Sequence, residues 1–290
     1  MPSLAHQLLV PYARHVMRAK PIVDPEGERR RFASKRRPLK VPADFTWAAK
    51  GGVPVLTHGS GDRTLFYVHG GSYNGNAAAQ HFSLVRRLAA RCNLRVIFPD
   101  YPLAPDFPWT SSHPQMSALL SGLAAEGPVV LAGDSAGGGY ALSLAMSLAT
   151  SLDGPDSHPL ESMVLISPWL DVSCSTPGIE EAAEWDPWLR LDRARVYGQW
   201  WAGDPTHTSR WEVSPLHGSL TNLPRTLAFQ GTRDILCPEN RLMRDQAASA
   251  GWDYTYVEEP GLMHVYPLLP IPEAKRAFEQ MVEFIGSPAV

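Results

Sequence analysis

Short apolar runs rich in β-branched residues recur along the chain from about residue 53, and segments with helical periodicity separate most of them. Seven runs have the length and composition of buried strands. They are Val53–Thr57, Leu65–Val68, Val96–Pro99, Val129–Ala132, Met163–Ser167, Thr226–Gln230 and Tyr254–Val257. Strands that alternate with helices are typical of a mostly parallel sheet covered on both faces. The pattern therefore predicts an α/β fold with a doubly wound sheet, in which ligands bind at the carboxyl ends of the strands.

Apolar residues at helical spacing mark the segments between these runs. Three helices are indicated by Phe82, Val85 and Leu88–Ala89, by Met116, Leu119, Leu120 and Leu123, and by Leu142, Ala145, Met146 and Ala149. Near the N-terminus, Leu4, Leu8, Leu9 and Tyr12 recur at the same spacing. We therefore expect an amphipathic helix there as well.

The alternation is interrupted between Pro168 and Leu220, where no run resembles a strand. Five of the nine tryptophans of the chain lie in this region, at Trp185, Trp188, Trp200, Trp201 and Trp211. So many aromatic rings have to be buried against something. We interpret the region as a helical lid formed together with the N-terminal segment; the alternative is ordinary packing within one domain. The predicted organisation is an N-terminal cap part (1–50), an inserted cap segment (168–216) and a sheet domain (51–167 and 217–290).

Composition narrows the classes of function. The 290 residues are 44% apolar, enough for a large core, and the formal net charge is −3. A nucleic-acid-binding protein usually has a basic excess, so we expect no nucleic-acid partner. The basic run from Arg29 to Arg37 is interpreted as a solvated or ion-paired face. Three widely spaced cysteines, Cys92, Cys174 and Cys237, with no signal-peptide-like or bilayer-spanning segment, favour a reducing, cytoplasmic location.

The motif GDSAG at residues 133–137 lies between an apolar run and a helical segment. That is the context that a nucleophile elbow requires. Small flanking residues permit a strained turn, which lifts the Ser135 hydroxyl out of the sheet at a helix N-terminus, where backbone N–H groups can face a developing oxyanion. A tight Gly-Ser turn without chemistry is the other interpretation of the motif taken alone.

A serine nucleophile needs a base, and the base needs an orienting carboxylate. Asp234 lies just after the sixth expected strand, in GTRDIL, and His264 lies in the segment after the seventh, in EEPGLMHVY. Three side chains from three strand ends can thus converge in the order Ser135, Asp234, His264. Asp171, which follows the fifth strand, is the runner-up for the acid.

The run LFYVHGGSY at Leu65–Tyr73 is a strand that enters a loop with two glycines. Because glycine has no Cβ, such a loop brings backbone N–H groups close to a ligand. A loop of this type supplies oxyanion donors beside the residue that follows the nucleophile, here Ala136. A plain strand-to-helix turn explains one glycine but not the whole run.

Together these motifs resemble the hormone-sensitive-lipase-like branch of the α/β-hydrolases, the bacterial carboxylesterases with a cap. The resemblance covers about Thr64 to His264. The matching stretches, in family order, are HGGSY at 69–73, DYPLAPD at 100–106, GDSAGG at 133–138, SPWL at 167–170, SPL at 214–216, GTRDIL at 231–236 and GLMH at 261–264.

The resemblance implies an α/β-hydrolase fold with a helical cap and a Ser135–His264–Asp234 triad. It also implies oxyanion donors from the backbones of Gly71, Ser72 and Ala136, with residues 51–167 and 217–290 as the catalytic domain. The chain departs from the family at two positions: Ser72 replaces a third glycine, and Pro102 replaces an arginine. Neither departure changes a reacting side chain.

We expect a serine carboxylesterase that acts on a small-molecule ester through an acyl-enzyme. An aromatic lid predicts an apolar pocket closed at one end, and hence short acyl chains. An amidase or peptidase on the same triad and a non-catalytic, ligand-binding homologue are the alternatives. No metal, organic cofactor or membrane span is expected, and the chain is expected to be a monomer or a homodimer.

Overall fold

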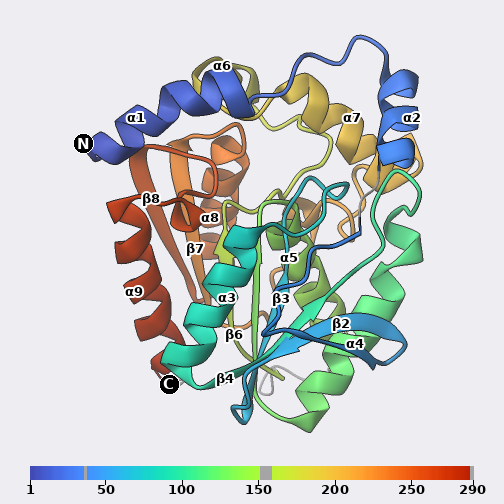
Figure 1. The fold of residues 1–290 in the computed structure, drawn as a ribbon, viewed down its shortest axis with the longest axis vertical. Helices are drawn as coiled ribbons and strands as arrows, with labels where there is room; N and C mark the ends of the chain where they lie inside the picture. Colours follow the sequence, from blue (N-terminus) through green and yellow to red (C-terminus); the bar gives the residue numbers. More distant parts are fainter. Residues whose placement is uncertain (36–37, 151–158, 288–290) are drawn as a thin grey trace.

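A single mixed sheet organises the molecule (Figure 1). The computed structural model describes residues 1–35, 38–150 and 159–287, and these form an eight-stranded sheet in the order β1-β2-β4-β3-β5-β6-β7-β8. The strands are β1 Thr46–Lys50, β2 Val53–His58, β3 Arg63–Val68, β4 Leu94–Pro99, β5 Val129–Asp134, β6 Leu160–Ile166, β7 Thr226–Arg233 and β8 Tyr254–Met263. β1 pairs antiparallel with β2, and β2 antiparallel with β4; the pairs from β4 to β8 are parallel. All seven expected strands are present.

The sequence pattern missed the edge strand β1. Its five residues, TWAAK, are mostly exposed, so no alternation of buried and exposed positions marks them. Gly51 and Gly52, with φ of 56° and 79°, connect it to β2 through a tight turn that favours glycine. Residues 46–50 therefore belong to the sheet, although we had expected them in the cap.

Helices cover both faces of the sheet. On one face, α3 (Ala79–Cys92) and α9 (Pro272–Gly286) bury residues such as Phe82 and Phe278 against the strands. On the other face, α4 (His113–Glu126), α5 (Ala136–Ala149) and α8 (Cys237–Ala250) bury Met116, Tyr140 and Met243. The three helices expected between strands are present, and the prediction of a mostly parallel, doubly wound sheet is confirmed.

A second group of helices lies beyond the sheet, at one end of the molecule (Figure 1). It comprises α1 (Leu4–Tyr12), the π-helical turn η1 (Ala13–Met17), α2 (Pro25–Lys35), α6 (Ile179–Trp185) and α7 (Leu191–Ala202). The N-terminal and inserted segments are joined directly. The backbone N–H of Ile22 donates to Asp192 Oδ2 at 2.9 Å, and Arg193 Nη1 donates to the carbonyl of Lys20 at 2.7 Å. A cap built from both segments requires such contacts, and the division into cap and catalytic domain stays a prediction.

The helix α1 is present where the spacing predicted it, but its apolar side faces outward. Leu4, Leu8 and Tyr12 are 70%, 68% and 53% exposed. Polar groups anchor the helix instead: Ser3 Oγ donates to Glu273 Oε2 at 2.8 Å, and His6 Nε2 accepts the N–H of Met263 at 3.1 Å. Periodicity thus identified the helix but not the side that is buried.

Short 3₁₀ turns complete the described structure, at η2 (Trp109–Ser111), η3 (Pro205–His207), η4 (Pro215–His217) and η5 (Tyr266–Leu268). Cys92, Cys174 and Cys237 are all free thiols. Within the described residues, none of the helices combines the length and the hydropathy needed to cross a bilayer.

Candidate active site

Ser135 occupies a sharp turn between the fully buried strand β5 and the helix α5. Its backbone has φ 53° and ψ −125°, a strained conformation for a residue with a side chain, which costs on the order of 1–3 kcal/mol. The residues two positions before and after Ser135 have to be glycine. A Cβ on Gly133 would lie 2.3 Å from the carbonyl oxygen of Gly137, and a Cβ on Gly137 would lie 2.1 Å from that of Val68. The sequence GDSAG therefore folds locally into a turn that presents the serine.

The three side chains predicted as nucleophile, base and acid form one hydrogen-bonded chain. His264 Nε2 lies 2.9 Å from Ser135 Oγ, and His264 Nδ1 lies 2.7 Å from Asp234 Oδ2. Asp234 follows the end of β7, and His264 follows the end of β8. Asp234 is fully buried, His264 is 3% exposed and Ser135 is 9% exposed, so only the serine borders open space. Their catalytic roles stay predictions.

Asp234 is itself held by further hydrogen bonds, and it influences the protonation of His264. Asp234 also accepts hydrogen bonds from the backbone N–H of Leu236 at 3.0 Å and from Gln230 Nε2 at 2.9 Å. Burial lowers the pKa of His264, but the charge of Asp234 and the hydrogen bond to it outweigh burial and raise the pKa above its usual value. A neutral His264 that donates Nδ1–H to Asp234 leaves Nε2 free to accept the Ser135 proton.

Asp171, the runner-up acid, lies in a different arrangement. It accepts hydrogen bonds from Ser173 Oγ at 2.6 Å and from the N–H groups of Ser173 and Ser175 at 3.0 and 3.1 Å. Its contact with a histidine is to His217, at 4.0 Å. The structure therefore brings His264 to Asp234 and uses Asp171 to close a turn.

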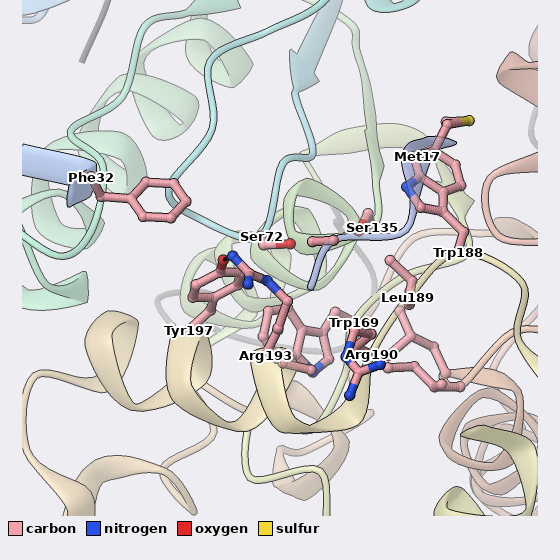
Figure 2. Close-up of a pocket in the computed structure, with 14 residues that line it drawn as sticks. Met17, Phe32, Ser72, Ser135, Trp169, Trp188, Leu189, Arg190, Arg193 and Tyr197 are labelled. Carbon is pink, nitrogen blue, oxygen red and sulfur yellow. Dashed lines mark hydrogen bonds between the residues drawn. The ribbon is translucent and has the colours of Figure 1, made fainter. Parts of the chain in front are cut away.

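The predicted oxyanion loop follows β3 and lies beside the nucleophile. Gly71 and Ser72 have φ of 123° and 54°, and the N–H of Gly75 closes the loop by donating to the carbonyl of Gly71 at 2.8 Å. In the described part of the chain, the N–H groups of Gly71, Ser72 and Ala136 donate to no protein acceptor. Figure 2 shows Ser72 next to Ser135. Donation to an oxyanion from these groups stays a prediction.

Sequence reasoning missed the residue that holds this loop. Asp134, 2% exposed, accepts the N–H of Gly70 at 3.0 Å and the Tyr67 hydroxyl at 2.8 Å on Oδ1, while His81 Nε2 lies 3.2 Å from Oδ2. Burial raises the pKa of Asp134, but His81 and these hydrogen bonds outweigh it and lower the pKa. The signal was available, because Asp134 immediately precedes the nucleophile in GDSAG.

The same loop is held from its other side by Tyr101, whose hydroxyl donates to the carbonyl of His69 at 2.8 Å. Pro102, which replaces the family's arginine, is adjacent to this contact. Nothing in the structure shows what substitutes for that arginine.

A second buried carboxylate, also missed, links the inserted segment to the triad. Asp186 is fully buried and accepts the N–H groups of Trp188 and Leu189 at 2.7 and 2.8 Å on Oδ1. On Oδ2 it accepts the N–H of Ile235, the residue after Asp234, at 2.9 Å. Burial, and then the charge of Asp234, raise the pKa of Asp186 to about 7. An aspartate before a proline indicates only a turn at the sequence level, so the pattern held no clear signal.

Ser135 opens onto a cavity of about 280 Å³ whose walls come from both ends of the chain (Figure 2). Met17 and Phe32 reach it from the N-terminal segment, and Trp188, Arg193 and Tyr197 reach it from the inserted segment. The Trp188 ring also packs edge-on against His264, with ring centroids 5.7 Å apart. The pocket is therefore shaped by residues outside the sheet.

Most of the tryptophans expected to form an aromatic lid do not line the cavity. Of the five tryptophans in 185–211, Trp188 lines the cavity, whereas Trp185 is 59% exposed and Trp201 is buried in the core, stacked on Tyr73 at 4.3 Å. The wall also carries two arginines, so the pocket is not purely apolar. Periodicity could not show which rings face the cavity. Among the described residues, no cluster of His, Cys, Asp or Glu side chains is arranged to hold a metal ion.

Comparisons with known proteins agree with this architecture. The chain matches the alpha/beta hydrolase fold family model over residues 65–268. It is 26% identical to an esterase of Acinetobacter venetianus over 81% of this chain and 78% of that protein, and 33% identical to an acetyl-hydrolase of Streptomyces hygroscopicus over 77% and 75%. A solved esterase of the bacterial hormone-sensitive lipase family is 25% identical, with a TM-score of 0.81 over 99% of this chain and 98% of that one. The resemblance found in the motifs is therefore confirmed, and the chain belongs to the alpha/beta hydrolase fold family.

Proposed function

We propose that this chain is a serine carboxylesterase that hydrolyses short-chain acyl esters through an acyl-enzyme on Ser135. Its general reaction class is carboxylic ester hydrolysis, as relatives named esterase and acetyl-hydrolase indicate. One observation carries the finer proposal: Ser135 Oγ, at the edge of a cavity, lies 2.9 Å from a histidine whose other ring nitrogen lies 2.7 Å from a buried carboxylate.

In the proposed reaction, neutral His264 takes the hydroxyl proton as Ser135 Oγ attacks the ester carbonyl carbon. The carbonyl oxygen becomes an oxyanion, and the backbone N–H groups of Gly71, Ser72 and Ala136 are its proposed donors. Protonated His264 then gives its proton to the departing alcohol. A water molecule, deprotonated by His264, then attacks the acyl-enzyme. Protonated His264 gives this proton to Ser135 Oγ as the acid leaves, which regenerates the hydroxyl. Asp234 holds the imidazole orientation throughout.

The size of the cavity supports short acyl chains. Its volume of about 280 Å³ is near the lower end of ordinary ligand pockets, which hold roughly 300–1,000 Å³. A short acyl group and a small alcohol fit such a space, whereas a long fatty-acyl chain does not fit without an opening between helices.

A panel of p-nitrophenyl esters from acetyl to palmitoyl tests this proposal. We expect kcat/KM to be highest for acetyl to hexanoyl esters and to fall sharply for palmitoyl. Replacing Ser135 by Ala should lower kcat by about 10⁴-fold or more, and a serine-directed phosphonate should label Ser135 alone. A matched p-nitroanilide separates an esterase from an amidase. Efficient palmitoyl turnover would contradict the chain length, and an active Ser135→Ala variant would contradict the nucleophile.

A further inference from the structure

The charged side chains around the cavity are all of one sign. Of the residues that the structure describes, Arg190 and Arg193 line the cavity, and no aspartate or glutamate does. In Figure 2, the Arg193 side chain extends from α7 toward Tyr197 and Ser72, whereas Arg190 lies beside the start of α7. We propose that the preferred esters carry a carboxylate at the end remote from the reacting carbonyl, bound by Arg190 with Arg193 beside it. This inference rests on the esterase function proposed above and names the substrate class of that site.

Arg190 has hydrogen-bonding groups to spare. Its Nε donates to Asp192 Oδ1 at 2.9 Å. A guanidinium carries five N–H groups, and in the described part of the chain no protein acceptor takes those of its two terminal nitrogens. Two parallel N–H groups match the two oxygens of a carboxylate, which a hydrocarbon end group cannot replace. The side chain is 26% exposed, so a ligand can reach it through the cavity.

The acidic partners of the two arginines stay outside the cavity. Asp192 is held by the N–H of Ile22, at 2.9 Å from its Oδ2, and Glu28 pairs with Arg193 and Arg31. Neither carboxylate lines the cavity. Each ion pair is thus oriented with its positive member toward the ester, and it presents a positive potential there even though the pair as a whole is neutral.

Arg193 contributes a fixed charge rather than free donors. Its Nη1 donates to the carbonyl of Lys20 at 2.7 Å, and its Nη2 donates to Glu28 and to the Tyr197 hydroxyl. The side chain is 11% exposed. A charge held in place by three partners needs no ordering when an anion binds, so it adds attraction at little entropic cost.

The remaining wall suits the linker between the two ends of such a substrate. Phe32, Trp169 and Leu189 also line the cavity and supply apolar surface there. A short methylene chain packs against these side chains while its carboxylate reaches Arg190. Monoesters of short dicarboxylic acids and acyl esters of short hydroxy acids both have this form, and the chemistry at the arginine is the same.

Sets of isosteric esters test the proposal. On the acyl side they are ethyl hydrogen glutarate, ethyl 5-oxohexanoate and ethyl 5-methylhexanoate, which end in a carboxylate, a methyl ketone and an isopropyl group. On the alcohol side they are 4-acetoxybutanoate and 4-methylpentyl acetate. The measured quantity is the ratio of kcat/KM for the carboxylate ester to that for its isopropyl isostere. This internal ratio removes any general loss of activity or folding.

In at least one of the two sets we expect the carboxylate ester to be favoured by about tenfold or more, the usual scale for a charge-assisted hydrogen bond. Arg190→Gln should lower that ratio by about tenfold, and Arg190→Lys should restore part of it because the charge remains. Added NaCl should reduce the wild-type ratio. Arg195→Gln is the matched control: Arg195 lies within α7, which Arg190 immediately precedes, pairs with Glu180 and does not line the cavity, so the ratio should not change.

The inference would be overturned if the wild type preferred neither carboxylate ester, or if a preference survived in Arg190→Gln. A preference for the ketone over the carboxylate would also overturn it, because a neutral acceptor would then suffice. Turnover of the isopropyl esters in any of these cases leaves the proposed esterase function standing. No turnover of any ester, by contrast, would contradict that function itself.

Discussion

The loops at the carboxyl ends of the strands and the segments that wall the pocket hold their polar side chains in different ways. Asp234, His264 and Asp134 are almost fully buried, and each is held by hydrogen bonds to other buried groups. In the pocket wall, Arg190 and Arg193 are held by ion pairs that remain partly exposed. The difference teaches that the groups proposed to react are held by buried contacts, while the cavity wall is joined by contacts that are individually easier to change. Substitutions in the first region should lower kcat, and those in the second should raise KM.

The largest effect is expected from a substitution among the buried polar side chains. Asp234→Asn keeps the shape of the side chain but removes the charge that orients His264 and supports its protonated form. We expect kcat to fall by roughly 10⁴-fold, as for loss of the acid in other serine triads. The measurement is kcat for a short-chain ester, with circular dichroism to check folding.

Asp171→Asn is the matched control for this variant. Asp171 is as buried as Asp234 but pairs with its own turn, so kcat should stay within about threefold of the wild type while stability falls. A large loss of kcat in Asp171→Asn, with little loss in Asp234→Asn, would move the acid to the earlier strand.

The next effect is a pH dependence of the free energy of unfolding, caused by Asp186, which links the inserted segment to the residue after Asp234. The pKa of Asp186 is about 7 in the folded chain, against an ordinary value of 3.8. Between about pH 4 and 7 the unfolded chain is ionised at this residue while the folded chain keeps its proton. The Asp186 contribution to the free energy of unfolding therefore falls as pH rises through this window, by at most about 1.4 kcal/mol per pH unit, and is constant above it.

Asp186→Asn removes this titration and serves as the reference. Urea unfolding of both proteins from pH 4 to 8 gives the difference in the free energy of unfolding at each pH. We expect the wild type to lose stability relative to Asp186→Asn up to about pH 7 and to follow it in parallel at higher pH. A difference that is independent of pH would show that Asp186 is ionised throughout.

A smaller effect is expected in the pocket wall. Glu28→Gln removes the charge that fixes Arg193 between the N-terminal segment and α7. We expect KM for an ester with a remote carboxylate, such as ethyl hydrogen glutarate, to rise severalfold, because Arg193 then has to be ordered when the anion binds, with kcat within about twofold. Glu180→Gln is its control, because Glu180 pairs with Arg195 but is 69% exposed, against 12% for Glu28. A fall in kcat without a change in KM would mean that the wall positions the reacting groups after all.

The smallest effect concerns Ser72, which has φ 54° and therefore a left-handed backbone. Ser72→Gly relieves that strain, about 1–2 kcal/mol, and this gain is largely offset by the greater freedom of glycine in the unfolded chain. The net change in stability should be below about 1 kcal/mol, and activity should stay within about threefold because the N–H remains. Thermal unfolding and kcat/KM measure both. A large loss of activity would assign a direct role to the hydroxyl.

Sequence reasoning reached the parts of the molecule in which a local pattern and the tertiary structure agree. The strands that precede Ser135 and Asp234 are buried on both faces, so their composition alone identified them. The strand before His264 is mostly half-buried, and its aromatic and β-branched residues Tyr254–Val257 identified it instead. The order of these strands predicted that the three side chains would meet. β1 was missed because an exposed edge strand has no apolar pattern.

Contacts between distant segments could not be predicted in the same way. The partners of Asp186 include Ile235, 49 residues away, and no spacing rule relates an inserted loop to a strand end. The same holds for Trp188 and Trp201, which are 13 positions apart in the inserted segment. One faces the cavity and the other the core, because the path of the chain between them decides it.

The N-terminal wall of the pocket has a consequence for how such enzymes diversify. Met17, Ala19 and Phe32 reach the cavity from a segment that ends before the first strand of the sheet. A recombination event that exchanges only the beginning of a gene can therefore replace one side of the cavity and leave the proposed triad and oxyanion loop unchanged. Substrate selectivity can then change without a change in the reacting groups.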